Sequence, residues 1–92
     1  WDTHANQGAS QGQLAGKFRE LDRGLARLKS GLEKTWNNTA VLVVTEFGRT
    51  AAVNGTQGTD HGTGGAALLL GGSVKGGRIQ GQWPGLASGN LY

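Results

Sequence analysis

The sequence predicts an α/β fold built on part of a doubly wound sheet, and three observations lead to this prediction. Residues 14–32 carry apolar side chains at helical spacing. Two short runs, residues 39–45 and 66–70, are almost wholly aliphatic or β-branched, as in strands that are covered on both faces. Most of the 18 glycines follow Phe47, so the second half is rich in loops. A chain of 92 residues forms at most one domain, with a marginal core unless a partner contributes.

The helix is the clearest predicted element. Its apolar residues recur at spacings of three and four, which places them on one face; they are Leu14, Phe18, Leu21, Leu25, Leu28 and Leu32. Lys29 and Glu33 are spaced to pair across one helical turn. Because the stripe is short and contains Gly24 and Gly31, packing on a sheet is favoured over a coiled coil. Asparagines at positions 37 and 38 favour an end to the helix.

Turns and loops connect the remaining elements. Residues 1–12 are polar and glycine-rich, and we expect a loop there that continues a chain beginning upstream of Trp1. Residues 51–65 are predicted to form a second loop, in which Asn54-Gly55 is a turn signal. A Gly-Gly pair between the apolar ends of residues 74–79 predicts a small C-terminal hairpin.

The net charge of +3 is confined to the predicted helix. Residues 13–35 hold six of the nine basic residues and three of the six acidic ones. A solvated basic face explains this better than a nucleic-acid surface, which needs a denser basic stripe with aromatic stacking partners. No apolar run is long enough to span a membrane. Because the chain has no cysteine, disulfides and thiolate metal sites are excluded.

Outside the helix, the acidic and imidazole side chains form three short clusters. These clusters are Asp2-Thr3-His4, Glu46 at the end of an apolar run, and Asp60-His61. Carboxylates and imidazoles are ligands for Zn, Mn and related divalent ions. Ligands in α/β proteins often lie at the edge where strands end, so convergence of the clusters there would create a metal site.

Each cluster also has an ordinary structural explanation. Asp2 is suited to a turn or cap, and Glu46 to a cap or to a salt bridge with Arg49. Asp60-His61 lies between glycines in a loop, an unusual setting for a purely structural contact. Arg49 is a candidate clamp for a substrate anion because its planar guanidinium suits oxyanions, and a structural ion pair is the alternative.

Four stretches together resemble the DUF1501 family, bacterial secreted proteins of unknown function that are related to alkaline phosphatases and sulfatases. The stretches are residues 1–7, 43–50, 58–62 and 71–77. The resemblance implies an alkaline-phosphatase-like three-layer doubly wound sheet, with one amphipathic helix, two or more buried strands and a glycine-rich C-terminal hairpin. It also implies that residues 1–92 are a single C-terminal fragment of a longer parent chain, and that the parent is periplasmic or secreted.

The same resemblance implies roles for individual residues. Asp2 and His4 resemble the first ligand pair of the superfamily, Glu46 resembles the acid that ends a strand, and His61 resembles a later histidine ligand. Asp60 either binds the metal or orients His61 as an outer carboxylate.

We therefore expect a divalent metal, one of Zn, Mn, Mg or Ca, held at an edge to which all three clusters contribute, with Arg49 facing an anionic ester substrate. The full-length parent would be a metal-dependent hydrolase of phosphoric or sulfuric esters, and the fragment would be inactive without the rest of the parent, which supplies the nucleophile. Phe47 stands where the superfamily has a second histidine, which favours the alternative of a non-catalytic binding or scaffold protein with an incomplete metal site.

Overall fold

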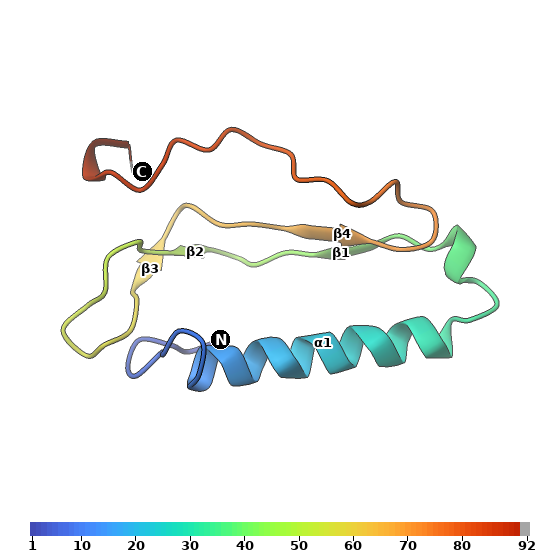
Figure 1. Cartoon of the computed structure of the whole chain (residues 1–92), viewed down its shortest axis with the longest axis horizontal. Coiled ribbons are helices and arrows are strands. Elements are labelled where there is room, and N and C mark those ends of the chain that lie inside the picture. The colour runs from blue at the N-terminus through green and yellow to red at the C-terminus, as the bar shows by residue number, and fades with distance from the viewer. Residues whose placement is uncertain (91–92) are drawn as a thin grey trace.

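The computed structural model describes residues 1–90, which form one α-helix, two 3-10 helices and two small antiparallel sheets. Helix α1 spans Gln13–Gly31, and the 3-10 helices η1 and η2 span Trp36–Asn38 and Ser88–Asn90. The strands are β1 (Val41–Val43), β2 (Gly48–Arg49), β3 (His61–Gly62) and β4 (Leu68–Leu70). The predicted mixture of helix and strand is confirmed. Helix α1 and strands β1, β2 and β4 run along the long axis of the molecule, whereas β3 crosses it steeply (Figure 1).

Helix α1 matches the predicted helix and uses its apolar stripe only in part. Most leucines of the stripe are half-buried, whereas Phe18 and Leu28 remain 54% and 40% exposed. The ring of Trp1 meets Phe18 edge-on, with 5.3 Å between ring centres. In place of the predicted pair with Glu33, the Lys29 ammonium lies over the Trp36 ring, 5.9 Å from its centre. This cation–π contact helps to join the helix end to η1.

The four strands belong to one interrupted ribbon. Strand β1 pairs with β4 from Val41↔Leu70 to Val43↔Leu68, and β2 pairs with β3 at Gly48↔Gly62 and Arg49↔His61. The chain advances five positions from Val43 to Gly48 but six from Gly62 to Leu68. The returning segment therefore carries one extra residue, as in a β-bulge, and such a bulge bends and twists a ribbon. This interruption separates the aliphatic half of the ribbon from the half that carries His61.

The prediction that both aliphatic runs form buried strands is wrong for this structure. Leu42, Leu68 and Leu69 are 62%, 48% and 58% exposed. Strands β1 and β4 are antiparallel because the chain between them turns back through β2 and β3, whereas parallel neighbours need a crossover connection. The aliphatic composition of the two runs reflects their pairing with each other, and it does not reveal how well their faces are covered.

The predicted C-terminal hairpin at residues 74–79 is also wrong. A turn starts directly after β4, where the backbone N–H of Val74 donates to the Gly71 carbonyl at 3.1 Å. Val74 is thus used in the turn, and Ile79 is fully exposed. Without an apolar pair across the Gly-Gly step, two strands have little to hold them together. The chain after β4 runs back along the ribbon without strand pairing until η2 (Figure 1).

Backbone contacts close the end of the molecule where the helix passes into β1. The N–H of Gly72 donates to the Trp36 carbonyl at 3.1 Å. Ser73 donates to the Thr39 carbonyl through its N–H at 3.3 Å and its hydroxyl at 2.9 Å. These bonds tie the turn after β4 to η1 and to the residue that precedes β1.

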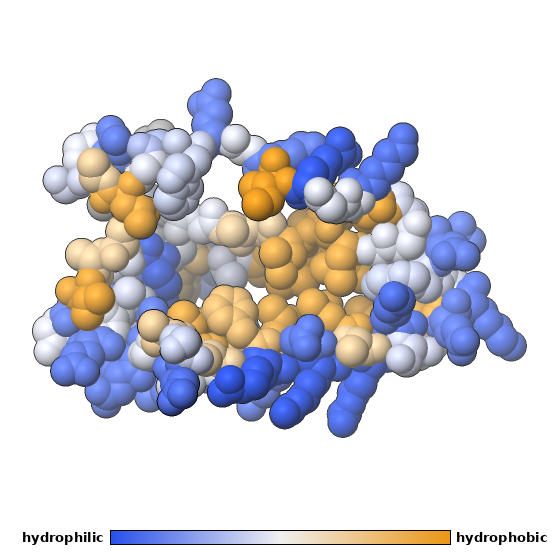
Figure 2. Space-filling model, viewed as in Figure 1, coloured by the Kyte–Doolittle hydropathy of each residue, from blue (hydrophilic) through white to orange (hydrophobic). Residues whose placement is uncertain are grey.

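Apolar side chains gather between α1 and the strands but are not sealed from solvent (Figure 2). Within residues 1–90, no apolar side chain is fully buried, and the most covered polar side chains are those of Thr3 and Thr59, at 3% and 8% exposure. Both threonines lie where the N-terminal segment meets the loop before β3. The described residues include no helix that is long and apolar enough to cross a membrane.

Candidate functional site

The N-terminal segment pairs with the loop that precedes β3, and this pairing builds the site. Ala5 forms an isolated antiparallel bridge with Gln57. Three backbone hydrogen bonds, 2.9–3.2 Å long, join the two segments: Asn6 N–H to Thr56 O, Gln7 N–H to Gln57 O, and Thr59 N–H to Thr3 O. The hydroxyl of Thr59 adds a 2.6 Å contact to the Gln7 side-chain oxygen. Two of the predicted clusters, whose histidines are 57 positions apart in sequence, are thereby brought to one end of the ribbon.

Gly58 is required by the close approach of these segments. A Cβ atom at this position would lie 2.3 Å from both the Thr3 carbonyl oxygen and the His4 carbonyl carbon. Such distances are far inside van der Waals contact, so any side chain at position 58 would force the N-terminal segment away from the loop. The glycine therefore serves the packing of the two histidine-bearing segments.

Asp2 and His4 form a local carboxylate–imidazole pair. The Oδ1 atom of Asp2 lies 2.7 Å from Nδ1 of His4 and also accepts the His4 backbone N–H at 3.2 Å. The hydrogen bond from the His4 ring, followed by the backbone bond and the charge attraction of His4, lowers the pKa of Asp2. A proton on Nδ1 leaves the Nε2 lone pair as the ring's metal-binding atom, and a carboxylate that holds this tautomer is a common companion of histidine ligands.

His61 lies between two other rings. Its imidazole stacks on Phe47 with 4.0 Å between ring centres and an angle of 28°, and it lies 4.9 Å from the ring of His4. The backbone of Phe47 is held by the Thr45 hydroxyl, which donates to the Phe47 carbonyl at 2.8 Å. Phe47, at the position where a second histidine was expected, therefore forms one wall against His61.

Arg49 joins three segments through backbone carbonyls. Its Nη1 donates to the Thr59 carbonyl at 2.7 Å and its Nη2 to the Trp1 carbonyl at 2.5 Å. Its guanidinium also lies 6.0 Å from the centre of the Phe47 ring. In the described part of the chain, Arg49 does not form the ion pair with Glu46 that was the structural explanation of this residue. Its structural contacts are hydrogen bonds to backbone carbonyls. Sequence reasoning missed this role because carbonyl acceptors carry no side-chain signature.

Asp60 is fixed by Thr50 and Asn54. The Asp60 backbone exchanges hydrogen bonds with Thr50, at 3.0 Å from the Thr50 N–H and at 3.1 Å to the Thr50 hydroxyl. The Asn54 amide donates to Asp60 Oδ1 at 2.9 Å and to the His4 carbonyl at 2.8 Å. Asn54 was recognised in the sequence only as a turn signal. The threonine two positions later adds to the pattern of an Asx-turn, which is the one sequence clue to its further contacts.

Glu46 forms no ion pair with either histidine within residues 1–90. It is exposed and lines an open hollow of about 270 Å³ at the interruption of the ribbon, together with Phe47 and Gly65. Across residues 1–90, no group of three or more His, Cys, Asp or Glu side chains is placed to hold a metal ion. The contact between the clusters is that of the His4 ring with the His61 ring.

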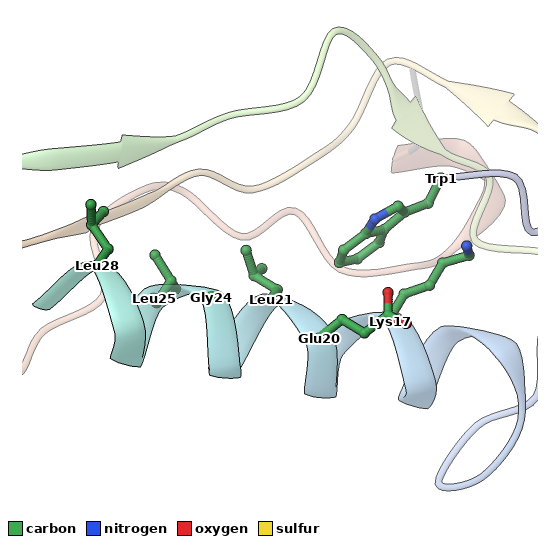
Figure 3. A pocket seen from close by; sticks show the side chains of 7 residues that line it. All are labelled: Trp1, Lys17, Glu20, Leu21, Gly24, Leu25 and Leu28. Carbon is green, nitrogen blue, oxygen red and sulfur yellow. The ribbon is translucent and has the colours of Figure 1, made fainter. Parts of the chain in front are cut away.

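A larger hollow of about 520 Å³ runs along α1 and is distinct from the histidine pair. Figure 3 shows the indole of Trp1 reaching over the helix at one end of it. Its floor is mostly apolar and includes Leu21, Gly24, Leu25 and Leu28. Lys17 and Glu20 supply its charged groups. With no cluster of ligands or nucleophiles, this hollow is a packing surface of the helix.

Comparison with models of known protein families matches the chain to one that is already described. The family model DUF1501, described as a protein of unknown function, matches residues 1–91. No curated protein and no solved structure matches the chain. The matched range includes every candidate site residue.

Proposed function

We propose that this chain, which belongs to the DUF1501 family, forms part of the metal-binding edge of a hydrolase that cleaves phosphoric or sulfuric esters. The observation that carries the proposal is the meeting of two imidazoles from distant segments, with 4.9 Å between the rings of His4 and His61. A carboxylate contacts His4 Nδ1 at 2.7 Å. Paired imidazoles with an orienting carboxylate are suited to a divalent ion such as Zn.

Each side chain has a distinct part in this proposal. His4 and His61 are the imidazole ligands, Asp2 orients His4, and Asp60 is either a further ligand or an outer carboxylate. Two imidazoles supply only half of the four ligands that Zn usually takes, so the remaining donors come from the rest of the parent chain. Glu46 contributes to the same metal only if that remainder rearranges the ribbon around it.

A bound divalent ion would polarise the ester's phosphoryl or sulfuryl oxygen and activate a nucleophile. The residues of this chain hold the two histidines in place, and one of them, Arg49, presents its guanidinium to the substrate. Arg49 is proposed to face the anion: Nη1 and Nη2 each carry a second N–H beyond the one given to a carbonyl. The parent would be periplasmic or secreted and would carry the alkaline-phosphatase-like sheet. The exposed leucines of β1 and β4 support the view that further elements cover this ribbon.

Calorimetric titration of the full-length protein with Zn²⁺ tests the ligand assignment. We expect His4→Ala and His61→Ala each to weaken binding at least tenfold, because each removes an imidazole donor. Asp22→Ala is the matched control, since it removes an exposed carboxylate from α1 without touching the site. Affinities of both histidine variants equal to that of the control variant would disprove the assignment.

A non-catalytic binding protein is the second candidate, and Phe47 favours it. The Phe47 ring covers one face of His61 at 4.0 Å, at the position where a second metal would need a ligand. A panel of phosphate and sulfate esters, assayed with Zn²⁺, Mn²⁺, Mg²⁺ and Ca²⁺, separates the two candidates. Zn²⁺ binding without turnover of any ester supports the second candidate, whereas turnover that His61→Ala abolishes supports the hydrolase.

A further inference from the structure

We propose that Asn54 is the positioning residue that holds the His4 segment and the Asp60-His61 segment at a fixed separation, so that the two imidazoles face one another. The inference about ring geometry stands on the contacts of Asn54 alone. Its consequence for metal binding rests on the proposed function.

The amide nitrogen of Asn54 bridges the two histidine-bearing segments. Nδ2 donates to the His4 carbonyl at 2.8 Å and to Asp60 Oδ1 at 2.9 Å. An amide nitrogen has two N–H groups, so these two acceptors use both. One acceptor belongs to His4 itself, and the other belongs to the residue next to His61. A single side-chain nitrogen thereby links His4 directly to the residue beside His61, in addition to the backbone bonds that pair the two segments.

The amide oxygen of Asn54 anchors the same side chain to its own loop. Oδ1 accepts the backbone N–H groups of Thr56 at 3.0 Å and Gly58 at 2.9 Å. The Thr56 hydroxyl lies 3.0 Å from the same oxygen, but its single proton has a shorter contact with the His4 carbonyl at 2.6 Å. The Asn54 backbone N–H also donates to the Gly58 carbonyl at 2.9 Å. The loop therefore clamps the side chain at one end while its nitrogen holds the histidine segments at the other.

The two ends of the amide are not interchangeable. A rotated amide would set its oxygen against the His4 carbonyl and the Asp60 carboxylate, and its nitrogen against the backbone N–H groups of Thr56 and Gly58. An aspartate at position 54 has the same shape but no N–H to donate, and its charge would repel Asp60. Position 54 thus needs a side chain with the length of asparagine that has both a hydrogen-bond donor and an acceptor.

Thr56 supports the same contact more weakly. Its hydroxyl lies 2.6 Å from the His4 carbonyl oxygen, the acceptor that it shares with Asn54. A valine at position 56 keeps the shape of threonine and removes only this hydroxyl. Thr56→Val therefore weakens the contact between this loop and the His4 carbonyl less than Asn54→Asp does.

Proton NMR of the full-length protein tests the positioning role without any metal. In the wild type we expect a cross-relaxation signal between the two histidine rings, and an upfield ring-current shift of His61 from the Phe47 face. Asn54→Asp should abolish the first and leave the second unchanged, because the pairing of β2 with β3 keeps His61 beside Phe47. Asn38→Asp, which makes the same chemical change in η1 at the far end of the molecule, should alter neither. Loss of stability alone would lower the melting temperature and leave both ring signals of the folded protein unchanged.

Zn²⁺ titration of the same proteins tests the consequence for the metal. We expect Asn54→Asp to weaken Zn²⁺ binding 10–100-fold, the usual range for loss of an outer-sphere partner, with Asn38→Asp within twofold of wild type. If the wild type binds no Zn²⁺, the proposed function fails, and the ring signals still decide the role of Asn54.

An unchanged ring-to-ring signal in folded Asn54→Asp would overturn the inference. If that variant does not fold, Thr56→Val decides by the same signals: a partial loss of the ring-to-ring signal supports the positioning role, and wild-type ring signals contradict it.

Discussion

At the scale of single residues, the candidate site depends on side chains that reach backbone carbonyls 10 to 50 positions away in sequence. Arg49 reaches the carbonyls of Trp1 and Thr59, and Asn54 reaches the carbonyl of His4. These donors act on backbone acceptors, so they fix the path of the chain and not only the orientation of one side chain. We therefore expect substitutions of Arg49 or Asn54 to disturb the geometry of the histidine pair, although neither residue belongs to it.

The acid titration of Asp2 provides one residue-scale prediction. Because the hydrogen bond from His4 lowers the pKa of Asp2 in the folded protein, this pair stabilises the fold fully only above the unfolded carboxyl pKa of about 3.9. Its contribution is lost as the pH falls through the lower, folded pKa. A ¹³C-carboxyl NMR titration should place the Asp2 pKa below 3.9, and His4→Ala should raise it. An Asp2 pKa that does not change in His4→Ala would contradict this account.

The close approach of Gly58 to Thr3 provides a second residue-scale prediction. Gly58→Ala should lower the free energy of unfolding of the full-length protein by about 1–3 kcal/mol, the cost of forcing atoms into a packed region, because its Cβ would lie 2.3 Å from the Thr3 carbonyl oxygen. Gly55→Ala is the matched control in the same loop, since a Cβ there meets nothing within 4 Å. Urea denaturation measures both changes, and equal effects of the two variants would disprove the steric argument.

At the scale of elements, the helix and the ribbon owe their form to different kinds of information. Helix α1 follows from the spacing of its own leucines, and its hydrogen bonds close within the segment. The ribbon follows from pairing between residues that are 12 to 29 positions apart. Its one-residue mismatch, between β1–β4 and β2–β3, separates the exposed leucines from the histidine site, and it places Glu46 at the interruption.

Two glycines test these elements in opposite directions. Gly24 lies inside α1, and a Cβ there meets nothing within 4 Å; Gly24→Ala should raise the free energy of unfolding by about 0.5–1 kcal/mol because alanine favours the helix. Gly71 has φ of +138° and would place a Cβ 2.1 Å from the Thr39 carbonyl oxygen, so Gly71→Ala should be destabilising. Circular dichroism melts measure the melting temperature of both variants, which should rise in Gly24→Ala and fall in Gly71→Ala. A shift of the same sign in both variants would refute these two predictions.

At the scale of the whole molecule, the chain is thin and open. Its accessible surface is 7488 Å², whereas a compact protein of 9.5 kDa exposes about 5,000 Å². Its radius of gyration is 15.8 Å, against roughly 12 Å for a compact domain of this length. Burial of apolar surface is the main source of folding free energy, so this open architecture gains little of that stabilisation.

The 92-residue polypeptide by itself should therefore behave as an incompletely packed protein. We expect it to bind the dye ANS, and to lose its structure over a broad temperature range without a sharp calorimetric transition. The physical reason is that no apolar side chain in residues 1–90 is fully buried. A sharp two-state transition, with no ANS fluorescence, would show that the apolar faces are covered in solution.

The sequence by itself determined the features that depend on local information. The spacing of Leu14 to Leu32 predicted α1, and Asn54-Gly55 predicted the turn that the structure contains, where the Gln57 N–H bonds to the Asn54 carbonyl. Residue chemistry also singled out the clusters that contain His4 and His61. The helix and turn predictions are confirmed because helical periodicity and turn preferences depend on residues that are neighbours in the sequence, whereas the roles of the site residues stay predictions.

Only the tertiary structure decided which clusters meet. The sequence predicted that all three clusters converge and ranked Asp60-His61 as the strongest, whereas the structure shows ring contact between the first cluster and the third, through His4 and His61. Strand direction, the bulge, the exposure of the leucines and the bridging role of Asn54 were likewise absent from the prediction. Each depends on hydrogen bonds or packing between distant segments, whose backbone groups are the same for every sequence and so leave no local pattern.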